Sequence, residues 1–429
     1  MPARLDATQR DFDEQFEKLL TRHRLATEVA NSVAEIIADI RLRGDAGLID
    51  ATRRFDRFDV TATSLPISDA ELDDAERSIT AEAIEALAFA KSRIEVFHRR
   101  QLPNDDRFVD ADGVALGSKW TPIDAVGLYV PGGTAAYPSS VLMNALPAKI
   151  AGVGRVVMVV PAPGGQLNPL VLTAARLAGV DEIYRVGGAQ AVAALAFGTA
   201  SIKPVDKIVG PGNAYVAEAK RQVFGHVGID SIAGPSEVLI IADEGGNPDW
   251  IAADLLAQAE HDILAQSILI TNSPDIAEAT MAAIEKQLND LPRADIAAES
   301  WSKRGAVVIV PTIAGAIPLA NKIAAEHVEL HVSDPESLAS EITNAGALFL
   351  GPHTPEAIGD YVGGPNHVLP TTGSARFSSG LSVVDFMKRT SILRCGPDQL
   401  RSLGGKAVTL AEAEGLGGHA RSVTIRLNL

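Results

Sequence analysis

The sequence predicts an α/β protein with mainly parallel sheets. From Ile123 onward, short apolar and β-branched runs alternate with alanine-rich stretches of helical periodicity. Strands that alternate with helices indicate right-handed βαβ units, whose strands pair in parallel. Several of the runs end in glycine-rich turns, and the series is long enough for two sheets. The predicted strands cover residues 123–130, 155–161, 182–186, 207–209, 238–242, 267–271, 306–310, 328–332 and 347–350.

Both ends of the chain are predicted to be helical. Residues 1–25 form one amphipathic pattern, with phenylalanines and leucines at helical spacing. Residues 28–101 continue in helical patterns that mix charged residues with Ala, Leu and Ile, which is typical of a solvated helical layer. After Gly380 the pattern is helical again. A short tail cannot make its own core, so we expect it to pack on the body or on another subunit.

The composition is that of a soluble globular protein with two or three structural units. The chain has 429 residues, of which 46% are hydrophobic and 21% are charged. A formal net charge of −16 argues against nucleic acid and anionic membranes as main partners, because both favour basic patches. The single cysteine, Cys395, can form neither an internal disulfide nor a cysteine-rich zinc site. The start lacks the apolar region of a secretory signal, and no apolar run approaches the roughly 20 residues of a membrane helix. We therefore expect a cytoplasmic protein.

Glycine-rich turns follow three predicted strands, at residues 130–134, 186–190 and 210–214. Glycine lets the backbone approach a phosphate closely, and a following helix N-terminus favours anions. Turns of this kind form ligand sites at the carboxyl ends of open α/β sheets. However, no GxGxxG fingerprint stands in the strand-to-helix context. Dinucleotide binding and ordinary tight turns are therefore both open interpretations.

Histidine, carboxylate and amide residues recur at spacings that suit a metal. Gln258 and His261 lie three apart in a helical stretch, which puts both side chains on one helix face. Asp360 follows in an irregular Gly/Pro-rich stretch that also contains His367, and His419 lies in the tail near Glu414. Nitrogen and oxygen ligands of this kind are acceptable to zinc. Solvent-exposed or structural roles are the alternative, and spacing alone leaves the convergence of these residues open.

Glu326 and His327 form an adjacent acid and imidazole at a predicted helix-to-strand junction. Imidazole can serve as a general base near neutral pH, and a neighbouring carboxylate can activate water. The alternative is a helix end with a capping histidine. We interpret His331 and Cys395 as structural residues.

The chain resembles the histidinol dehydrogenase family in many segments, in order along almost its whole length. The segments are VGLYVPGGTAAYPSSVLMNALPAKIAGV, YRVGGAQAVAALAFGT, VGPGNAYVAEAKR, IAGPSEVLIIAD, DLLAQAEHD, AAEHVEL, IGDYVGGPNHVLPT, ARFSSGLSVVDFMKRTS and AEAEGLGGHARSV. The resemblance implies two Rossmann-like domains that lack the GxGxxG fingerprint, in an intertwined homodimer. The implied divisions are a helical segment 1–25, a first domain 26–128 with 236–380, a second domain 129–235 on the NAD side, and a tail 381–429 that packs on the partner subunit.

The resemblance also implies a zinc site, an NAD site and their residues. The residues that match the zinc ligands are Gln258, His261, Asp360 and, from the partner subunit in the family, His419. The residues that match other substrate contacts are Ser236, Glu326, His327, His367 and Glu414. The residues that match NAD contacts are Tyr129, Gln190 and Asn213.

The implied reaction is the oxidation of L-histidinol by two NAD+ and water, through the aldehyde, to L-histidine, the last step of histidine biosynthesis. Zinc would position the substrate, His327 would take the hydroxyl proton, and Glu326 would activate water to attack the retained aldehyde. A relative that oxidises another polar alcohol, such as a sulfonated diol, should differ around the substrate. A metal-dependent hydrolase would need no NAD, and a non-catalytic binding protein would have no use for the reactive residues.

Overall fold

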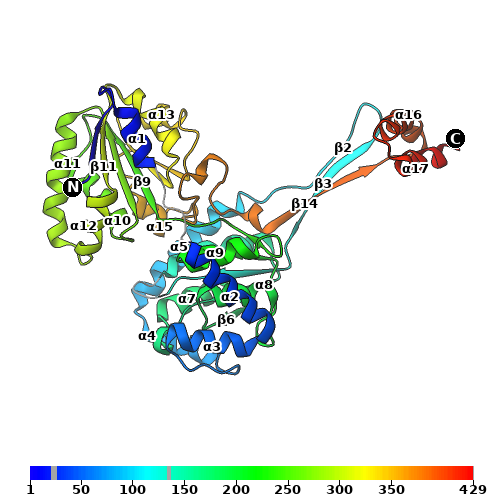
Figure 1. Cartoon of the computed structure of the whole chain (residues 1–429), viewed down its shortest axis with the longest axis horizontal. Coiled ribbons are helices and arrows are strands. Elements are labelled where there is room, and N and C mark those ends of the chain that lie inside the picture. The colour runs from blue at the N-terminus through cyan, green and yellow to red at the C-terminus, as the bar shows by residue number, and fades with distance from the viewer. Residues whose placement is uncertain (21–26, 133–136, 429) are drawn as a thin grey trace.

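A computed structural model describes residues 1–20, 27–132 and 137–428. Two α/β units and a long arm are evident in it (Figure 1). The end of the predicted N-terminal helix and the predicted turn residues Gly133 and Thr134 lie outside the described residues. No helix in the described part of the chain is long and apolar enough to cross a membrane.

One unit is built on a five-stranded parallel sheet in the order β6-β5-β4-β7-β8. Its strands are short and apolar, because both faces of the sheet are covered by helices. The strands are β4 (Ala125–Tyr129), β5 (Arg155–Val159), β6 (Glu182–Tyr184), β7 (Lys207–Val209) and β8 (Gly228–Ile229). The crossover helices are α6 (Pro138–Ala151), α7 (Pro169–Ala178), α8 (Gly188–Phe197) and α9 (Ala214–Val223).

The other unit is built on a six-stranded parallel sheet in the order β1-β11-β10-β9-β12-β13. Its strands are β1 (Ala3–Asp6), β9 (Glu237–Ala242), β10 (Gln266–Thr271), β11 (Ala306–Ile309), β12 (His327–His331) and β13 (Ala347–Leu350). Its helices are α1 (Phe12–Leu20), α10 (Pro248–Ala259), α11 (Pro274–Gln287), α12 (Ala294–Arg304), α13 (Ala316–Ile323), α14 (Pro335–Ala339) and α15 (Glu356–Tyr361).

The two sheets share one topology. Leaving out the edge strand β1, each has the order third-second-first-fourth-fifth along its own stretch of chain. The first and fourth strands, β4 with β7 and β9 with β12, are therefore neighbours, and the chain turns in opposite directions on either side of them. Such a switch point opens a crevice at the carboxyl ends of its strands. The prediction of an α/β fold with parallel sheets is confirmed, and each of the nine predicted strands occurs.

The N-terminal helices belong to a different unit than predicted. The division that grouped residues 26–128 with 236–380 is wrong for helices α2 (Thr27–Arg43), α3 (Asp45–Asp56), α4 (Asp69–Ser78) and α5 (Ala81–Arg99). Helix α2 packs on α8 and α9, α4 packs on α7, and α5 packs on α6 and α7. Their apolar faces join the two cores of the five-stranded unit. An amphipathic pattern shows which face of a helix is buried but not which sheet buries it.

The first 25 residues are not one helix. Residues Ala3–Asp6 instead form β1, which pairs in parallel with β11, and Leu5 is buried in the core of the six-stranded unit. Helix α1 follows, and its Phe12 and Phe16 are buried as their spacing predicts. Pairing with β11, about 300 residues away in the sequence, supplies backbone hydrogen bonds that no local pattern reveals.

The C-terminal segment forms an arm that projects from the body (Figure 1). The predicted helix after Gly380 is wrong for β14 (Met387–Arg394), which pairs antiparallel with β3 (Ala115–Pro122), itself paired with β2 (Asp106–Val109). Helices α16 (Pro397–Ala413) and α17 (Gly417–Leu427) then pack against each other at the tip of this ribbon. The first residues of the tail, Leu381, Val383 and Phe386, are buried in a core of the five-stranded unit, whereas β14, α16 and α17 extend away from the body. Packing of this outer part on another subunit stays a prediction.

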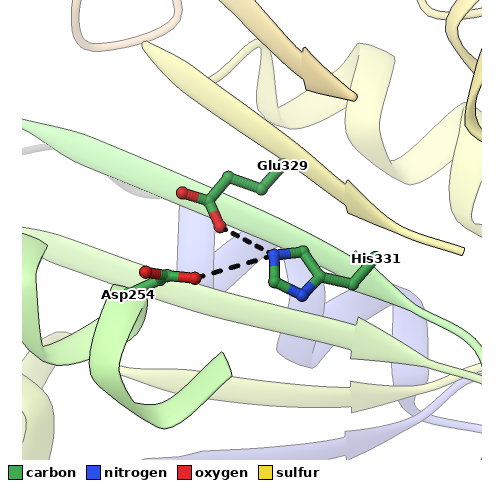
Figure 2. A group of neighbouring side chains, drawn as sticks. All are labelled: Asp254, Glu329 and His331. Carbon is green, nitrogen blue, oxygen red and sulfur yellow. Dashed lines mark hydrogen bonds and ion pairs between the residues drawn. The ribbon is translucent and has the colours of Figure 1, made fainter. Parts of the chain in front are cut away.

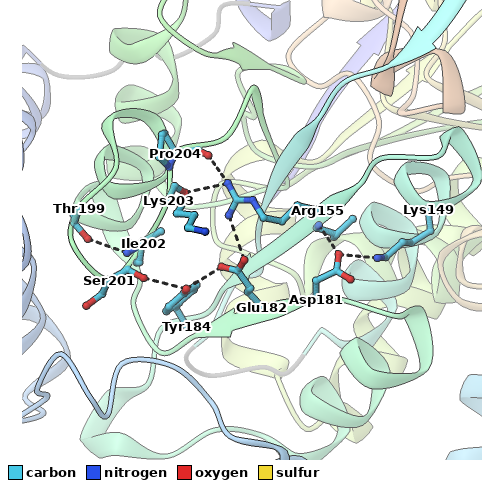
Figure 3. A network of polar contacts seen from close by, with 11 residues as sticks. Lys149, Arg155, Asp181, Glu182, Tyr184, Thr199, Ser201, Ile202, Lys203 and Pro204 are labelled. Atoms are coloured by element: carbon cyan, nitrogen blue, oxygen red, sulfur yellow. Dashed lines mark hydrogen bonds and ion pairs between the residues drawn. The ribbon is translucent and has the colours of Figure 1, made fainter.

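A polar network ties together the loops that precede β5, β6 and β7 (Figure 3). Arg155 faces Glu182 at 3.5 Å and donates hydrogen bonds to the carbonyls of Lys203, at 3.3 Å, and Pro204. Lys149 and Asp181 form an ion pair at 2.7 Å beside it. These groups lie at the amino ends of the strands, so this end of the sheet is fixed by paired charges, opposite the crevice.

Candidate active site

A polar seam lies between strand β12 and helix α10. Alternate residues of β12, His327, Glu329 and His331, point to one face of the sheet, whereas Val328 and Leu330 enter the core on the other face. Asp254 and Gln258 are one turn apart on α10, and Asp254 lies 3.6 Å from His331 Nε2. In a buried strand, this alternation indicates that the polar side chains do more than fill the core.

Three of the four predicted metal ligands come together at the end of this seam. Gln258 is fully buried near the end of α10, and His261 follows in the turn that ends the helix, where its N–H donates to the Gln258 carbonyl at 3.2 Å. Asp360 comes from α15 rather than from the irregular stretch that the sequence suggested. One ligand atom each of His261, Asp360 and Glu356 lies within 4.8 Å of the others.

Asp360 also faces two further histidines. Its Oδ1 lies 3.7 Å from His367 Nδ1 and 3.9 Å from His327 Nε2. His367 belongs to a segment that packs on α6 of the other unit, where its Nε2 lies 3.3 Å from the Ser140 hydroxyl. The first turn of α6 follows the loop after β4. The cluster therefore lies where the two α/β units meet.

Glu326 and His327 are held by the first residue of β9. His327 Nδ1 lies 3.2 Å from the carbonyl of Glu237, which can only accept, so Nδ1 carries the ring proton and Nε2 is the free acceptor that faces Asp360. The Glu326 carboxylate accepts from the Glu237 N–H at 3.1 Å and from the Ser236 side chain. The predicted pair thus stands at the start of β12, and His327 does not cap a helix.

Burial drives the acids and bases of the cluster toward their neutral forms. Burial lowers the pKa of His327 to about 3 and that of His367 to about 4. It raises the pKa of Asp360 to about 7, and burial with neighbouring carboxylates raises the pKa of Glu326 and Glu356 well above the usual range.

Neutral imidazoles beside crowded carboxylates are a donor set that fits a divalent cation. A bound cation would keep the carboxylates ionised and would take the imidazole and amide as further ligands. Gln258, His261 and Asp360 supply one oxygen, one nitrogen and one oxygen donor, which is acceptable to zinc.

Two predicted site residues are not brought to this cluster by the same chain. His419, in the first turn of α17, and Glu414, at the end of α16, are exposed at the tip of the arm.

Sequence reasoning missed Glu356, which is buried one helical turn before Asp360. It also missed the group formed by Asp254, Glu329 and His331 (Figure 2). The four-residue spacing of Glu356 and Asp360 and the alternation in HVELH were the available signals.

A second group lies at the crevice of the five-stranded sheet. Tyr129 ends β4, Gln190 lies in the first turn of α8 after β6, and Asn213 precedes α9 after β7. Tyr129 is buried, which raises its pKa to about 12, and its hydroxyl accepts from the Gly188 N–H at 3.0 Å. The buried Gln190 Nε2 has no hydrogen-bond partner among the described residues. Asn213 is exposed and caps α9. The three predicted NAD contacts thus lie at or just after the carboxyl ends of β4, β6 and β7, the end of the sheet where ligands of such folds bind.

The comparisons with known proteins agree over the full chain. The family model described as histidinol dehydrogenase matches residues 20–427. The histidinol dehydrogenases of Nitrobacter winogradskyi and Bradyrhizobium diazoefficiens are 65% and 64% identical to the chain, and each match covers 100% of both sequences. A crystal structure of histidinol dehydrogenase from Elizabethkingia anophelis is 36% identical with a TM-score of 0.95, and the match covers 100% of this chain and 98% of that one. The chain therefore belongs to the histidinol dehydrogenase family of oxidoreductases.

Proposed function

We propose that the protein oxidises L-histidinol through the aldehyde to L-histidine, with two NAD+ as hydride acceptors and zinc as the resident metal. The observation that carries this proposal is the meeting of Gln258, His261 and Asp360 with the Glu326–His327 pair, at the junction with the unit that holds the crevice. Family membership supplies the substrate, which offers an amine and an imidazole to a metal.

The residues of the chain divide into binding and reacting groups. Gln258, His261 and Asp360 would hold the zinc ion. Zinc bound there would supply a Lewis acid that orients the substrate nitrogens and fixes the carbinol carbon. Tyr129, Gln190 and Asn213 would form the NAD site at the strand ends.

His327 is the proton acceptor for the alcohol. Its Nδ1 is occupied by the Glu237 carbonyl at 3.2 Å, and burial keeps the ring neutral, so Nε2 is available to take the hydroxyl proton. Hydride loss to the first nicotinamide then gives the aldehyde.

Glu326 is the base for the second half of the reaction. Its carboxylate is fixed by the Glu237 N–H and lies 3.9 Å from His327 Nδ1, so it can take a proton from a water molecule that attacks the aldehyde. As the water adds, protonated His327 returns its proton to the aldehyde oxygen, which gives the hydrated aldehyde and a neutral ring. The hydrated aldehyde then loses a second hydride to another NAD+, and His327 accepts the hydroxyl proton again. Ser236 steadies Glu326 through a hydrogen bond, and we place His367 around the polar groups of the substrate.

We also propose that the site is completed by a second copy of the chain. His419 and Glu414 are exposed at the end of an arm whose ribbon and tip also expose apolar side chains, including Phe108, Leu393 and Leu410. A partner subunit that received this arm would gain the fourth zinc ligand from His419 and a substrate contact from Glu414.

The overall reaction is tested by counting NADH. Purified, zinc-loaded protein with excess NAD+ should form two NADH for each L-histidinol consumed and release L-histidine. If no NADH forms although zinc is bound and the fold is intact, the substrate assignment must be withdrawn in favour of another polar alcohol.

The shared site is tested by mixing subunits. Inactive His419→Ala and inactive His327→Ala proteins should regain activity when their subunits are exchanged, because one site of the mixed dimer is then intact. Subunit exchange without recovery would contradict a site shared across the dimer.

A further inference from the structure

The amide of Gln258 has one buried partner that fixes its orientation. With its nitrogen toward Glu356, the amide donates to both carboxylate oxygens, at 3.0 and 3.2 Å. In the opposite orientation the amide oxygen would face only acceptors and the amide nitrogen only donors, so neither end would be satisfied. Gln258 and Glu356 are both buried, so water does not compete strongly for these bonds. The amide oxygen is therefore turned away from Glu356, where it can serve as a metal ligand.

Glu356 is itself anchored from strand β12. Its backbone N–H donates to Glu329 Oε1 at 2.7 Å, and the other oxygen of Glu329 lies 3.1 Å from His331 Nε2. The same His331 nitrogen lies 3.6 Å from the carboxylate of Asp254. Figure 2 shows His331 facing both acids, Glu329 and Asp254. Glu329 and the His331 side chain are fully buried. The Glu356–Glu329 contact thus links α15 to β12 and the His331–Asp254 contact links β12 to α10, while Glu329 and His331 meet within β12.

These contacts close a loop. From Asp254 on α10 the chain of contacts crosses β12 through His331 and Glu329, reaches the start of α15 at Glu356, and returns to α10 at Gln258. Gln258 and His261 lie at the end of α10, and Asp360 lies on α15. The closed ring of contacts therefore sets the distance between Asp360 and the other two proposed ligands. A metal site needs its ligands held close to the geometry that the metal requires. Residues that hydrogen-bond to the ligands fix this geometry.

We propose that Glu356 is a positioning residue for the metal: it holds the Gln258 amide with its oxygen toward the site, and Glu329 holds Glu356 in place. This inference rests on the proposed zinc site. The competing role is direct ligation, since a Glu356 oxygen lies within 4.8 Å of ligand atoms of His261 and Asp360.

Two substitutions at Glu356 separate these roles. Glu356→Gln keeps an oxygen that can accept from the Gln258 amide, whereas Glu356→Met has a similar volume and no such acceptor. The zinc dissociation constant of each apo-protein is measured by competition with a chelator, without an activity readout. The reference is His261→Asn, which removes a proposed ligand. The control is Glu285→Met, which makes the same substitution at an exposed site on α11.

Positioning predicts a graded result. Glu356→Gln should bind zinc within roughly fivefold of the unmodified protein, and Glu356→Met should bind about 10- to 100-fold more weakly, the usual loss when a supporting residue is removed. Glu285→Met should bind as the unmodified protein does. If Glu356→Met does not fold, Glu356→Asp replaces it, because the carboxylate is then withdrawn from the amide by one methylene and the same loss is expected.

Two outcomes would overturn the inference. If Glu356→Gln bound zinc as weakly as His261→Asn, Glu356 would be a direct ligand. If Glu356→Met bound zinc with unchanged affinity, Glu356 would not position the Gln258 amide. Failure of the proposed metal site gives a different result, because the unmodified protein itself would then not bind zinc.

Discussion

Gly210 directly follows β7, at the end of the sheet where the crevice lies, and its backbone has a conformation that only glycine adopts easily. Its φ is +111°, and a Cβ added there would lie 2.1 Å from the carbonyl oxygen of Tyr129 at the end of β4. Gly225, in the same unit, has a φ of +98° but nothing within 4 Å of an added Cβ. Substitution of each glycine by alanine therefore separates backbone strain from a clash at the crevice.

The two substitutions should differ in stability. Gly225→Ala carries only the strain of its positive φ, about 1–2 kcal/mol. In Gly210→Ala the end of β4 or the turn must also move by about 1 Å to relieve the 2.1 Å contact. Overpacking of that kind costs about 1–3 kcal/mol more. At roughly 2–4 °C per kcal/mol for a unit of this size, Gly210→Ala should melt several degrees below Gly225→Ala.

The same pair tests the proposed NAD site. Displacing Tyr129 should weaken NAD+ binding about tenfold or more in Gly210→Ala, because a shift of 1 Å disrupts positioned contacts. Gly225→Ala should bind NAD+ as the unmodified protein does. Both variants should keep their zinc affinity, since Gln258, His261 and Asp360 lie on the other unit and His419 lies on the arm. Calorimetric titrations with NAD+ and thermal unfolding curves give both quantities. Gly210→Ala with unchanged NAD+ affinity and a melting temperature equal to that of Gly225→Ala would refute the reasoning.

Three further changes test the cluster and the seam. His261→Asn should lose zinc affinity while the apo-protein unfolds within about 2 °C of the unmodified apo-protein, and retained zinc in a metal analysis would remove His261 from the ligand set. Glu326→Gln should slow oxidation of the aldehyde more than oxidation of the alcohol, because only the second step needs activated water. Single-turnover rates measure this, and an equal loss in both steps would count against a base role. Burial, together with the nearby Glu329 carboxylate, raises the pKa of Asp254 from 3.8 to about 8. A carboxyl group whose pKa is raised by folding stabilises the fold fully below its unfolded pKa and loses that contribution as the pH rises through the folded pKa. Asp254→Asn does not titrate, so urea unfolding of the apo-protein should show the variant gaining stability relative to the unmodified protein between about pH 4 and pH 8, by a few kcal/mol. A difference that stays constant over this range would contradict the prediction.

The strands of the two sheets could be predicted because their burial leaves a local record. A parallel strand covered on both faces must be apolar along its length, as in β9, where all six residues are buried. Strands β1 and β14 leave no such record. β1 is four residues long, and β14 is largely exposed, so both are defined by hydrogen bonds to β11 and β3.

The sequence by itself determined the α/β class, the strand positions and, through resemblance, the family and the residue types of its site. Only the tertiary structure decided that helices α2–α5 cover the five-stranded sheet and that His419 lies far from Asp360 along an arm. It alone brought Glu356 to Gln258, about 100 residues away in the sequence, and joined Asp254 to Glu329. The reason is physical: hydrophobic pattern and propensity act over one or two turns of chain, whereas a metal site depends on side chains whose distance is set by how separate elements pack.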